Sequence, residues 1–132
     1  MILSFSNSHR YFVYRLAADM RKGFDGLSGL VRSEFSLNPL SGDVFIFFNR
    51  PHNRIKILHW QGDGFAIYCK RLEKGTFELP EENTSGTSIE ISSEQLHFIL
   101  HGIVLSSVKK RPRYEHSIVD KKSIESGLSA VC

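Results

Sequence analysis

The stretch that decides the fold is Asp43-Val-Phe-Ile-Phe-Phe-Asn-Arg-Pro-His-Asn-Arg-Ile-Lys-Ile-Leu-His-Trp-Gln-Gly-Asp-Gly-Phe-Ala-Ile-Tyr-Cys-Lys-Arg-Leu-Glu-Lys-Gly-Thr-Phe77. It contains three runs of β-branched and aromatic residues, Val44 to Phe48, Ile55 to Trp60 and Phe65 to Lys70. Only residues 49–53 and 61–64 separate these runs, and their Asn, Pro and Gly content is typical of hairpin turns. Because connections this short cannot hold a crossover helix, the stretch predicts an antiparallel three-stranded meander.

The register of the second hairpin is open between two alternatives. If residues 62–64 form a three-residue loop with a bulge, Lys56, Trp60, Tyr68 and Lys70 share one face of the sheet. A four-residue loop would instead place Trp60 with Phe65 and Tyr68 with Ile57, because a slip of one residue turns every side chain to the other face. We favour the first register.

The remaining elements follow from periodicity and capping signals. Residues 10–16 are aromatic and β-branched enough for a fourth strand. A helix should begin with Asp19 as its N-cap and cover the apolar face of the sheet through residues spaced by three and four: Met20, Phe24, Leu27, Leu30, Val31 and Phe35. Residues 89–91 suggest a short strand, and Ser92 or Ser93 should cap a second helix from Glu94 to about Leu105. The predicted fold class is α+β, an antiparallel sheet of the N-terminal strand and the meander, covered by one helix, with a second C-terminal helix.

The first predicted helix carries Gly23, Gly26 and Gly29 at every third position. Each costs roughly 1 kcal/mol relative to Ala in a helix interior, so close packing of this helix against the sheet is the favoured explanation, ahead of a ligand role. Arg21 and Lys22 fall in the expected first turn, where the helix dipole disfavours cations. Their position there is a hint of an anionic partner.

The length of 132 residues suits one domain, which we place at residues 1–108, followed by a basic and flexible tail at 109–132. Charge is segregated along the chain: residues 1–75 carry eleven Lys and Arg against six Asp and Glu, residues 76–108 carry five Glu and no basic residue, and the tail carries six basic and three acidic residues. No apolar run approaches the ~18 residues of a membrane span. The first ten residues lack the features of a signal peptide, so a cytoplasmic protein is expected.

Catalytic and metal chemistry find little support in the sequence. Asp19, Asp25, Asp43, Asp63 and Glu73 could in principle hold metal ions for phosphoryl transfer, but a helix cap, a turn and a strand entry account for three of them. His97 and His101 are four apart on the second helix without an evident third ligand. We therefore expect no catalytic residue, no metal site and no cofactor; a small metal-dependent nuclease is the least favoured reading.

Binding has more support. Cations on or beside the strands are interleaved with Tyr14, Trp60 and Tyr68, which suits contact with a phosphate backbone; these cations are Arg15, Arg50, Arg54, Lys56, Lys70, Arg71 and Lys74. The alternative is a solvated, edge-protecting surface in which Trp60 and Tyr68 belong to the core. The residues alone leave these two interpretations equally open.

Four ordered blocks resemble the second open-reading-frame product, or TnpB-type accessory protein, of bacterial insertion sequences of the sixty-six family. The blocks are Asp19-Met-Arg-Lys-Gly-Phe-Asp-Gly-Leu27, Pro39-Leu-Ser-Gly-Asp-Val-Phe-Ile-Phe47, Lys56-Ile-Leu-His-Trp-Gln-Gly-Asp-Gly-Phe65 and Lys70-Arg-Leu-Glu-Lys-Gly-Thr-Phe77. Gln61 departs from the family's usual acidic residue ahead of Gly-Asp-Gly, and His59 replaces a common aromatic.

The resemblance implies a non-catalytic accessory role in DNA transposition beside a larger transposase. The expected partners are element DNA, the transposase, or both. Our candidates for DNA contact are Arg21, Lys22, Lys56, Lys70 and Arg71. The alternative is that the protein is a protein-interaction module. It would then dock on the transposase through Trp60 and Tyr68, and only the transposase would contact DNA.

Overall fold

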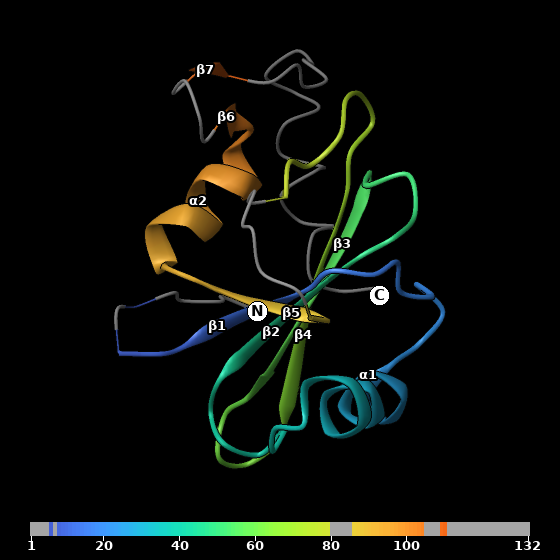
Figure 1. Ribbon diagram of the computed structural model, residues 1–132, viewed down its shortest axis with the longest axis vertical. Coiled ribbons are helices and arrows are strands. Elements are labelled where there is room, and N and C mark those ends of the chain that lie inside the picture. Colours follow the sequence, from blue (N-terminus) through green and yellow to red (C-terminus); the bar gives the residue numbers. More distant parts are fainter. Residues whose placement is uncertain (1–5, 7, 80–85, 105–108, 111–132) are drawn as a thin grey trace.

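The computed structural model describes residues 6, 8–79, 86–104 and 109–110, and its centre is a five-stranded sheet (Figure 1). The strands lie in the order β4-β3-β2-β1-β5. Their bounds are Tyr11–Tyr14 for β1, Val44–Phe48 for β2, Arg54–Trp60 for β3, Phe65–Arg71 for β4 and Ser88–Ile91 for β5. The meander β2-β3-β4 and the N-terminal strand are therefore confirmed.

Two helical segments pack on this sheet. Helix α1 (Phe24–Leu30) continues without a break as the π-helical turn η1 (Val31–Phe35), and helix α2 (Ser93–His101) follows β5. Two short strands, β6 (Ile103–Val104) and β7 (Lys109–Lys110), pair antiparallel beyond α2. The α+β class is confirmed.

The sheet is mixed rather than wholly antiparallel. Strand β1 pairs parallel with β2, because the chain between them crosses over through α1 and η1. Every other neighbouring pair is antiparallel, including β1 with β5. The predicted strand at residues 89–91 thus completes the sheet beside β1.

Both faces of the sheet are buried, which the prediction of one covering helix did not anticipate. The face under α1 and η1 holds Phe12, Tyr14, Leu27, Val31, Phe35, Phe45, Phe47, Leu58 and Ile67. The face under α2 holds Tyr11, Val13, Val44, Ile46, Phe48, Ile55, Ile57, Leu72, Phe77, Ile89, Ile91, Leu96, Ile99 and Leu100. Because β2 contributes to both cores, all five of its residues are buried, as in a strand covered on two sides.

The second hairpin adopts the register that the sequence analysis did not favour. Trp60 lies opposite Phe65 and Ile57 opposite Tyr68, and Gln61 donates its backbone N–H to the carbonyl of Gly64. The turn is therefore a four-residue loop. Since this shifts β4 by one residue, Lys56 and Trp60 face α1 whereas Tyr68 and Lys70 face α2, and the predicted common face is wrong.

The first helix starts later than predicted, and Asp19 is not its cap. Asp19 instead closes a turn, in which its side chain accepts the backbone N–H of Arg21 at 2.9 Å and its carbonyl accepts that of Lys22 at 3.1 Å. The N–H of Ala18 donates to the carbonyl of Phe48 at the end of β2, so the chain is still held along the sheet where the helix was expected. Arg21 and Lys22 thus precede the helix rather than occupy its first turn.

The glycines of α1 do not serve close packing. A Cβ built on Gly23 or Gly29 would meet no atom within 4 Å, and one on Gly26 would meet only the side chain of Lys22. The explanation favoured from sequence is therefore wrong for this helix. Its apolar side reaches the sheet through Leu27 and Val31, both fully buried.

The second helix carries the predicted cap. Ser92 accepts the N–H of Gln95 at 3.1 Å, and the Gln95 side chain accepts the N–H of Ser92 at 2.8 Å, a complete capping box. The helix ends before Gly102, whose left-handed conformation (φ 76°) stops it short of Leu105.

Of the tail predicted from residue 109, the structure describes only Lys109–Lys110. The rest of that prediction, and the domain boundary at residue 108, stay predictions. Among the described residues, no helix has the length and apolarity that crossing a membrane would need.

Candidate nucleic-acid interface

Two of the predicted DNA contacts are tied to the protein itself, on opposite faces of the sheet. Lys56 is 3% exposed, and its Nζ donates to the carbonyl of Lys22 at 2.9 Å. Burial, and secondly the nearby guanidinium of Arg54, lower the pKa of Lys56. Lys70 is half-buried and donates to the carbonyl of Leu100 near the end of α2 at 3.1 Å. Both lysines join the sheet to a helical layer, and they form no shared surface.

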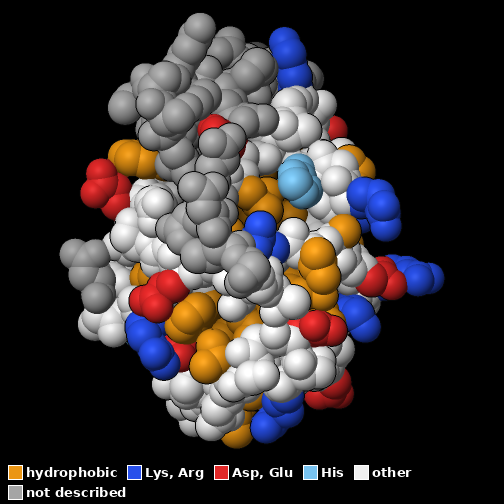
Figure 2. All heavy atoms as spheres, in the orientation of Figure 1, with side chains coloured by type: hydrophobic (Ala, Val, Ile, Leu, Met, Phe, Trp, Pro, Cys, Tyr) orange, Lys and Arg blue, Asp and Glu red, His pale blue; other side chains and the backbone are white. Residues whose placement is uncertain are grey.

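Of the other three candidates, Arg71 lies at one end of the sheet, which we call the basic end, and Arg21 and Lys22 lie in the loop that leads from that end to α1. The basic end is built by residues 17–22, 49–54 and 71–75 and carries six exposed or half-buried cations: Arg21, Lys22, Arg50, Arg54, Arg71 and Lys74. Hydrogen bonds join the three segments, from Ala18 to Phe48 at the end of β2 and from Leu72 to the carbonyl of Asn53. Figure 2 shows Lys and Arg side chains along the right-hand edge of the face it draws, the side on which Figure 1 places the loop before α1.

Arg54 and Arg71 form the centre of the basic end, because they lie directly opposite each other on β3 and β4. Side chains in such a pair have Cβ atoms about 4.5–5.5 Å apart, and like charges there are destabilising. Both side chains are exposed. The strand pairing therefore concentrates positive charge at a point that solvent and an anionic ligand can reach.

Two carboxylates lie in the same three segments, and each is already paired with an arginine. Asp19 pairs with Arg21 at 2.8 Å and Glu73 with Arg71 at 3.0 Å, all four side chains being well exposed. Hydrogen bonds from the side chain and the backbone N–H of Arg21 lower the pKa of Asp19 to about 2. Six cations against two carboxylates leave an excess of positive charge at this end.

The turn between β2 and β3 holds Arg50 and Arg54 on a rigid frame. The side-chain oxygen of Asn49 accepts the N–H groups of Asn53 and Arg54, and its amide nitrogen donates to the side chain of Asn53 at 2.7 Å. His52 adopts a left-handed conformation (φ 58°) that non-glycine residues rarely take. Its carbonyl accepts the N–H of Phe77 at 2.7 Å, so the segment after β4 fixes the turn from outside.

Aromatic side chains gather at the opposite end of β3, which we call the aromatic end and define as Phe24, Trp60 and Phe65. The ring of Phe65 contacts that of Trp60 edge-on at 5.0 Å between centroids and stacks on that of Phe24 at 6.5 Å. Phe24 is 49% exposed, and Trp60 is half-buried. Tyr68, the second predicted interface residue, packs against the core under α2 instead, where burial raises its pKa.

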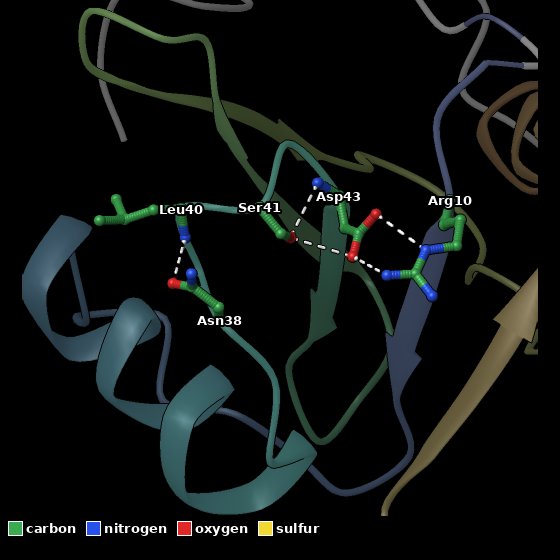
Figure 3. A network of polar contacts seen from close by, with 5 residues as sticks. All are labelled: Arg10, Asn38, Leu40, Ser41 and Asp43. Carbon is green, nitrogen blue, oxygen red and sulfur yellow. Dashed lines mark hydrogen bonds and ion pairs between the residues drawn. The ribbon is translucent and has the colours of Figure 1, made fainter.

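The starts of β1 and β2 are joined by a polar network shown in Figure 3. Arg10 donates to both carboxylate oxygens of Asp43, at 3.1 and 2.8 Å, and the hydroxyl of Ser41 donates to the same carboxylate at 3.0 Å. Asn38 accepts the backbone N–H of Leu40 in the preceding loop. The carboxylate of Asp43 thus holds two parallel strands together, as a strand-entry residue would.

His59 is buried next to this network. Its ring lies 4.9 Å from that of His9, and its Nδ1 has no hydrogen-bond partner among the described residues. Burial, and secondly His9, lower the pKa of His59. A neutral imidazole is therefore the form that the folded protein favours.

The acidic and histidine candidates for metal binding do not converge. Within the described ranges, no three His, Cys, Asp or Glu side chains lie close enough together to hold a metal ion. His97 and His101 stack on each other on α2, with ring centroids 6.1 Å apart. The arrangement at the basic end can attract and hold an anion, and it offers no evident reactive group.

These observations define the class of the protein: a small α+β protein with a basic end and an aromatic end. A family model described as "IS66 Orf2 like protein" matches residues 9–110. The chain belongs to this family, and membership indicates an accessory role in transposition.

Two relatives from Sinorhizobium fredii are described as uncharacterized proteins. Protein y4hO is 39% identical over 85 residues, which cover 64% of this chain and 72% of the relative. Protein y4jC is 30% identical over 107 residues, which cover 81% of this chain and 90% of the relative. No solved structure matches the chain.

Sequence reasoning missed part of each end. Arg50, Arg54 and Lys74 were noted as cations near strands but were not among the DNA candidates. Phe24 and Phe65 were not assigned to an interface. The signal that could have found both ends is the four-residue turn, since its register alone places Arg54 opposite Arg71 and Trp60 opposite Phe65.

Proposed function

We propose that this protein assists transposition by binding element DNA through the basic end. The observation that carries the proposal is the exposed pair Arg54 and Arg71, held side by side on β3 and β4. Phosphate groups are the natural ligands of such a cluster, because each cation that neutralises a phosphate releases a condensed counterion. Arginine also presents planar donors that match phosphate oxygens.

The folding cost of the pair supports a ligand role. Like charges directly opposite in a sheet are destabilising, and although Arg71 pairs with Glu73, no ion pair of Arg54 is found among the described residues. An anion bound between Arg54 and Arg71 would offset this repulsion. The rigid turn supports binding further, since Asn49 and Asn53 fix the backbone that carries Arg50 and Arg54 before any ligand arrives.

The proposal is tested by fluorescence anisotropy with labelled element-end duplex and the variant Arg54→Glu. We expect affinity to fall at least about tenfold and the slope of log K against log salt to flatten by up to about 2, because Glu at position 54 removes one phosphate contact and neutralises Arg71. The same change converts a like-charge cross-strand pair into an opposite-charge pair, so the free energy of unfolding should stay the same or rise by about 0.2–1 kcal/mol. Loss of binding could then not be attributed to unfolding.

The matched control is Arg32→Glu, which makes the same charge change at an exposed position of η1. Helical turn η1 packs on β1 and β2 through Phe35, whose ring meets those of Tyr14 and Phe45, and so lies away from the β3-β4 hairpin. Equal loss of affinity in both variants would mean that only net charge matters. Unchanged affinity in Arg54→Glu would remove the basic end from the proposal.

In this proposal the protein carries out no chemical step and needs no cofactor. The transposase performs strand cleavage and joining, and the accessory protein works in the cytoplasm where the element DNA lies. Arg21, Lys22 and Arg71 remain DNA contacts from the original set. Lys56 and Lys70 are assigned a positioning role, since each amine donates to a backbone carbonyl of the protein.

The aromatic end supports a second candidate function, docking on the transposase. Phe24 is one of the largest exposed apolar side chains of the described residues, and its ring continues the Phe65 and Trp60 contact onto the surface. Aromatic anchors of this kind carry much of the energy of protein interfaces. Tyr68 takes no part in this candidate, because it lies on the other face of the sheet.

Co-purification of the transposase with the variant Phe24→Ser tests this second candidate. We expect capture of the transposase to weaken by about tenfold or more if Phe24 is an anchor, while DNA affinity of the accessory protein alone stays unchanged. Leu40→Ser, at another exposed apolar position (44% exposed), is the matched control. Equal capture by wild type and Phe24→Ser would exclude the aromatic end as the docking site.

A further inference from the structure

We propose that the ligand of the basic end is double-stranded DNA, bound along its phosphate backbone in preference to a single strand. The inference rests on the proposed function and specifies the substrate class of the same site. Two observations support this inference. One is the scarcity of exposed aromatic rings around the cations of the basic end, and the other is the set of hydrogen bonds that fixes the backbone carrying these cations.

Among the described residues of the basic end, only His52 has a ring that is partly exposed. The two phenylalanines there, Phe48 and Phe77, are each 1% exposed and pack on each other at 5.7 Å between centroids. The ring of His52 is half-buried against Phe48 at 5.9 Å. Proteins that hold single strands combine a basic groove with rings on which successive bases stack, at about 1–3 kcal/mol per base. The basic end has the charge for binding a single strand but lacks the stacking surface.

The rings that could stack on bases lie elsewhere. Trp60 is at the far end of β3 from Arg54, about 20 Å away at the rise of a strand, and it packs edge-on against Phe65. Phe24, two residues after Lys22, stacks its ring on that of Phe65, and Tyr68 faces α2. A single strand held between Arg54 and Arg71 would therefore not reach these rings without leaving that pair.

The polar groups of the turn are also engaged. The side-chain oxygens of Asn49 and Asn53 and the amide nitrogen of Asn49, which could hydrogen-bond to unpaired bases, are used in bonds between these two residues and to the turn backbone. What this end presents is a set of cations on a fixed frame. Such a set matches the regular, dense charge of a duplex, one negative charge per about 1.7 Å of axis against about 3.4 Å for one strand.

The test compares two labelled probes with the full-length protein at three salt concentrations: a duplex of ~20 base pairs, about two helical turns, and one of its strands, chosen without self-complementarity. We expect the duplex to bind at least about tenfold more tightly, with the steeper salt slope of about −0.9 per phosphate contact against about −0.7 for the strand. The variant His52→Ala should leave duplex affinity unchanged, because the ring of His52 is used in packing on Phe48.

The outcomes separate this inference from the proposed function. A single strand bound as tightly as the duplex, or more tightly, overturns the preference while DNA binding stands. A fall in single-strand affinity in His52→Ala to below half would likewise show that the ring stacks on bases. If neither probe binds at low salt, the basic end is not a DNA site, and the proposed function fails with the inference.

Discussion

At the scale of single residues, the structure separates cations that build the fold from cations that a ligand can reach. Lys56 and Arg54 are two positions apart on β3, yet Lys56 is 3% exposed and Arg54 is exposed. The aliphatic stem of Lys56 crosses the α1-side core, and its amine reaches the carbonyl of Lys22. Lys56 thus ties the loop before α1 to the sheet.

Removing that tie should cost stability. We expect Lys56→Ala to lower the free energy of unfolding by about 2 kcal/mol, because it leaves the carbonyl of Lys22 without its charged donor and empties the space of the stem. Lys56→Met should cost less, since it keeps the stem and relieves a buried charge. Urea unfolding followed by the fluorescence of Trp60 measures both. A loss below about 0.5 kcal/mol in Lys56→Ala would mean that the bond is not made in solution.

His59 should give the protein a dependence of stability on pH. Burial, and secondly His9, lower its pKa below the ordinary 6.5, so the unfolded chain takes up a proton at a pH where the folded protein does not. Stability is therefore full above about pH 6.5 and falls as the pH is lowered through the range between the unfolded and the folded pKa.

Urea unfolding at about pH 7.5 and about pH 5 checks the prediction, with His59→Phe as the comparison. Wild-type protein should lose more free energy of unfolding between the two pH values than the variant, in which this titration is absent. Equal losses in the two proteins would show that His59 titrates in the folded state as it does in the unfolded chain.

At the scale of elements, local signals set where α2 begins, whereas tertiary contacts set where α1 begins. Ser92, one of the two residues expected to cap α2, forms a capping box with Gln95. Asp19 offers the same kind of signal before α1, but the bond from Ala18 to Phe48 holds the chain along the sheet at that point. The helix consequently starts at Phe24, after a turn closed by Asp19 itself.

The cap of α2 is expected to contribute measurably. Ser92→Ala should lower the free energy of unfolding by about 1 kcal/mol, because the N–H of Gln95 loses its acceptor. Ser92→Asp, which keeps an oxygen acceptor at the cap, should change it by no more than about 0.5 kcal/mol. Chemical unfolding of both variants decides the matter, and an equal loss in Ser92→Ala and Ser92→Asp would contradict the assignment of Ser92 as the cap.

At the scale of the whole molecule, the sheet separates two surfaces. Strand β3 begins with Arg54 at the basic end and finishes with Trp60 at the aromatic end, about 20 Å apart. Both faces of the sheet between them are filled by the two cores. The ends of the β3-β4 hairpin, rather than the faces of the sheet, are therefore the surfaces that we propose for partner binding.

Because no hydrogen bond, ion pair or ring contact among the described residues joins Arg54 to Phe24, changes at these two positions should add. We expect the stability effects of Arg54→Glu and Phe24→Ser to sum in the double variant within about 0.5 kcal/mol. DNA affinity of the double variant should equal that of Arg54→Glu alone. A coupling above about 1 kcal/mol in the double-mutant cycle would show that the hairpin transmits changes from one end to the other.

Much of the architecture could be predicted from the sequence. The runs of β-branched and aromatic residues and the turn residues between Val44 and Lys70 predict the meander, and four ordered blocks within residues 19–77 predict the family that the match over residues 9–110 confirms. The register of the second hairpin could not be predicted, because Gly62-Asp63-Gly64 is compatible with a three- or a four-residue loop. The candidate site depended on the register of this hairpin. The wrong register placed Lys56 and Trp60 on the same face of the sheet as Tyr68 and Lys70.

By itself, the sequence determined the class of fold, the order of the strands in the meander, the cap of α2 and the family, since each depends on residues close together in the chain. Only the tertiary structure decided which cations are exposed. The side of a strand that a residue faces depends on its pairing with a neighbouring strand, and burial depends on the helix that covers that side. Lys56 is buried and Lys70 half-buried because α1 and α2 cover both faces of the sheet, while Arg54 and Arg71 stay exposed because they lie at its end.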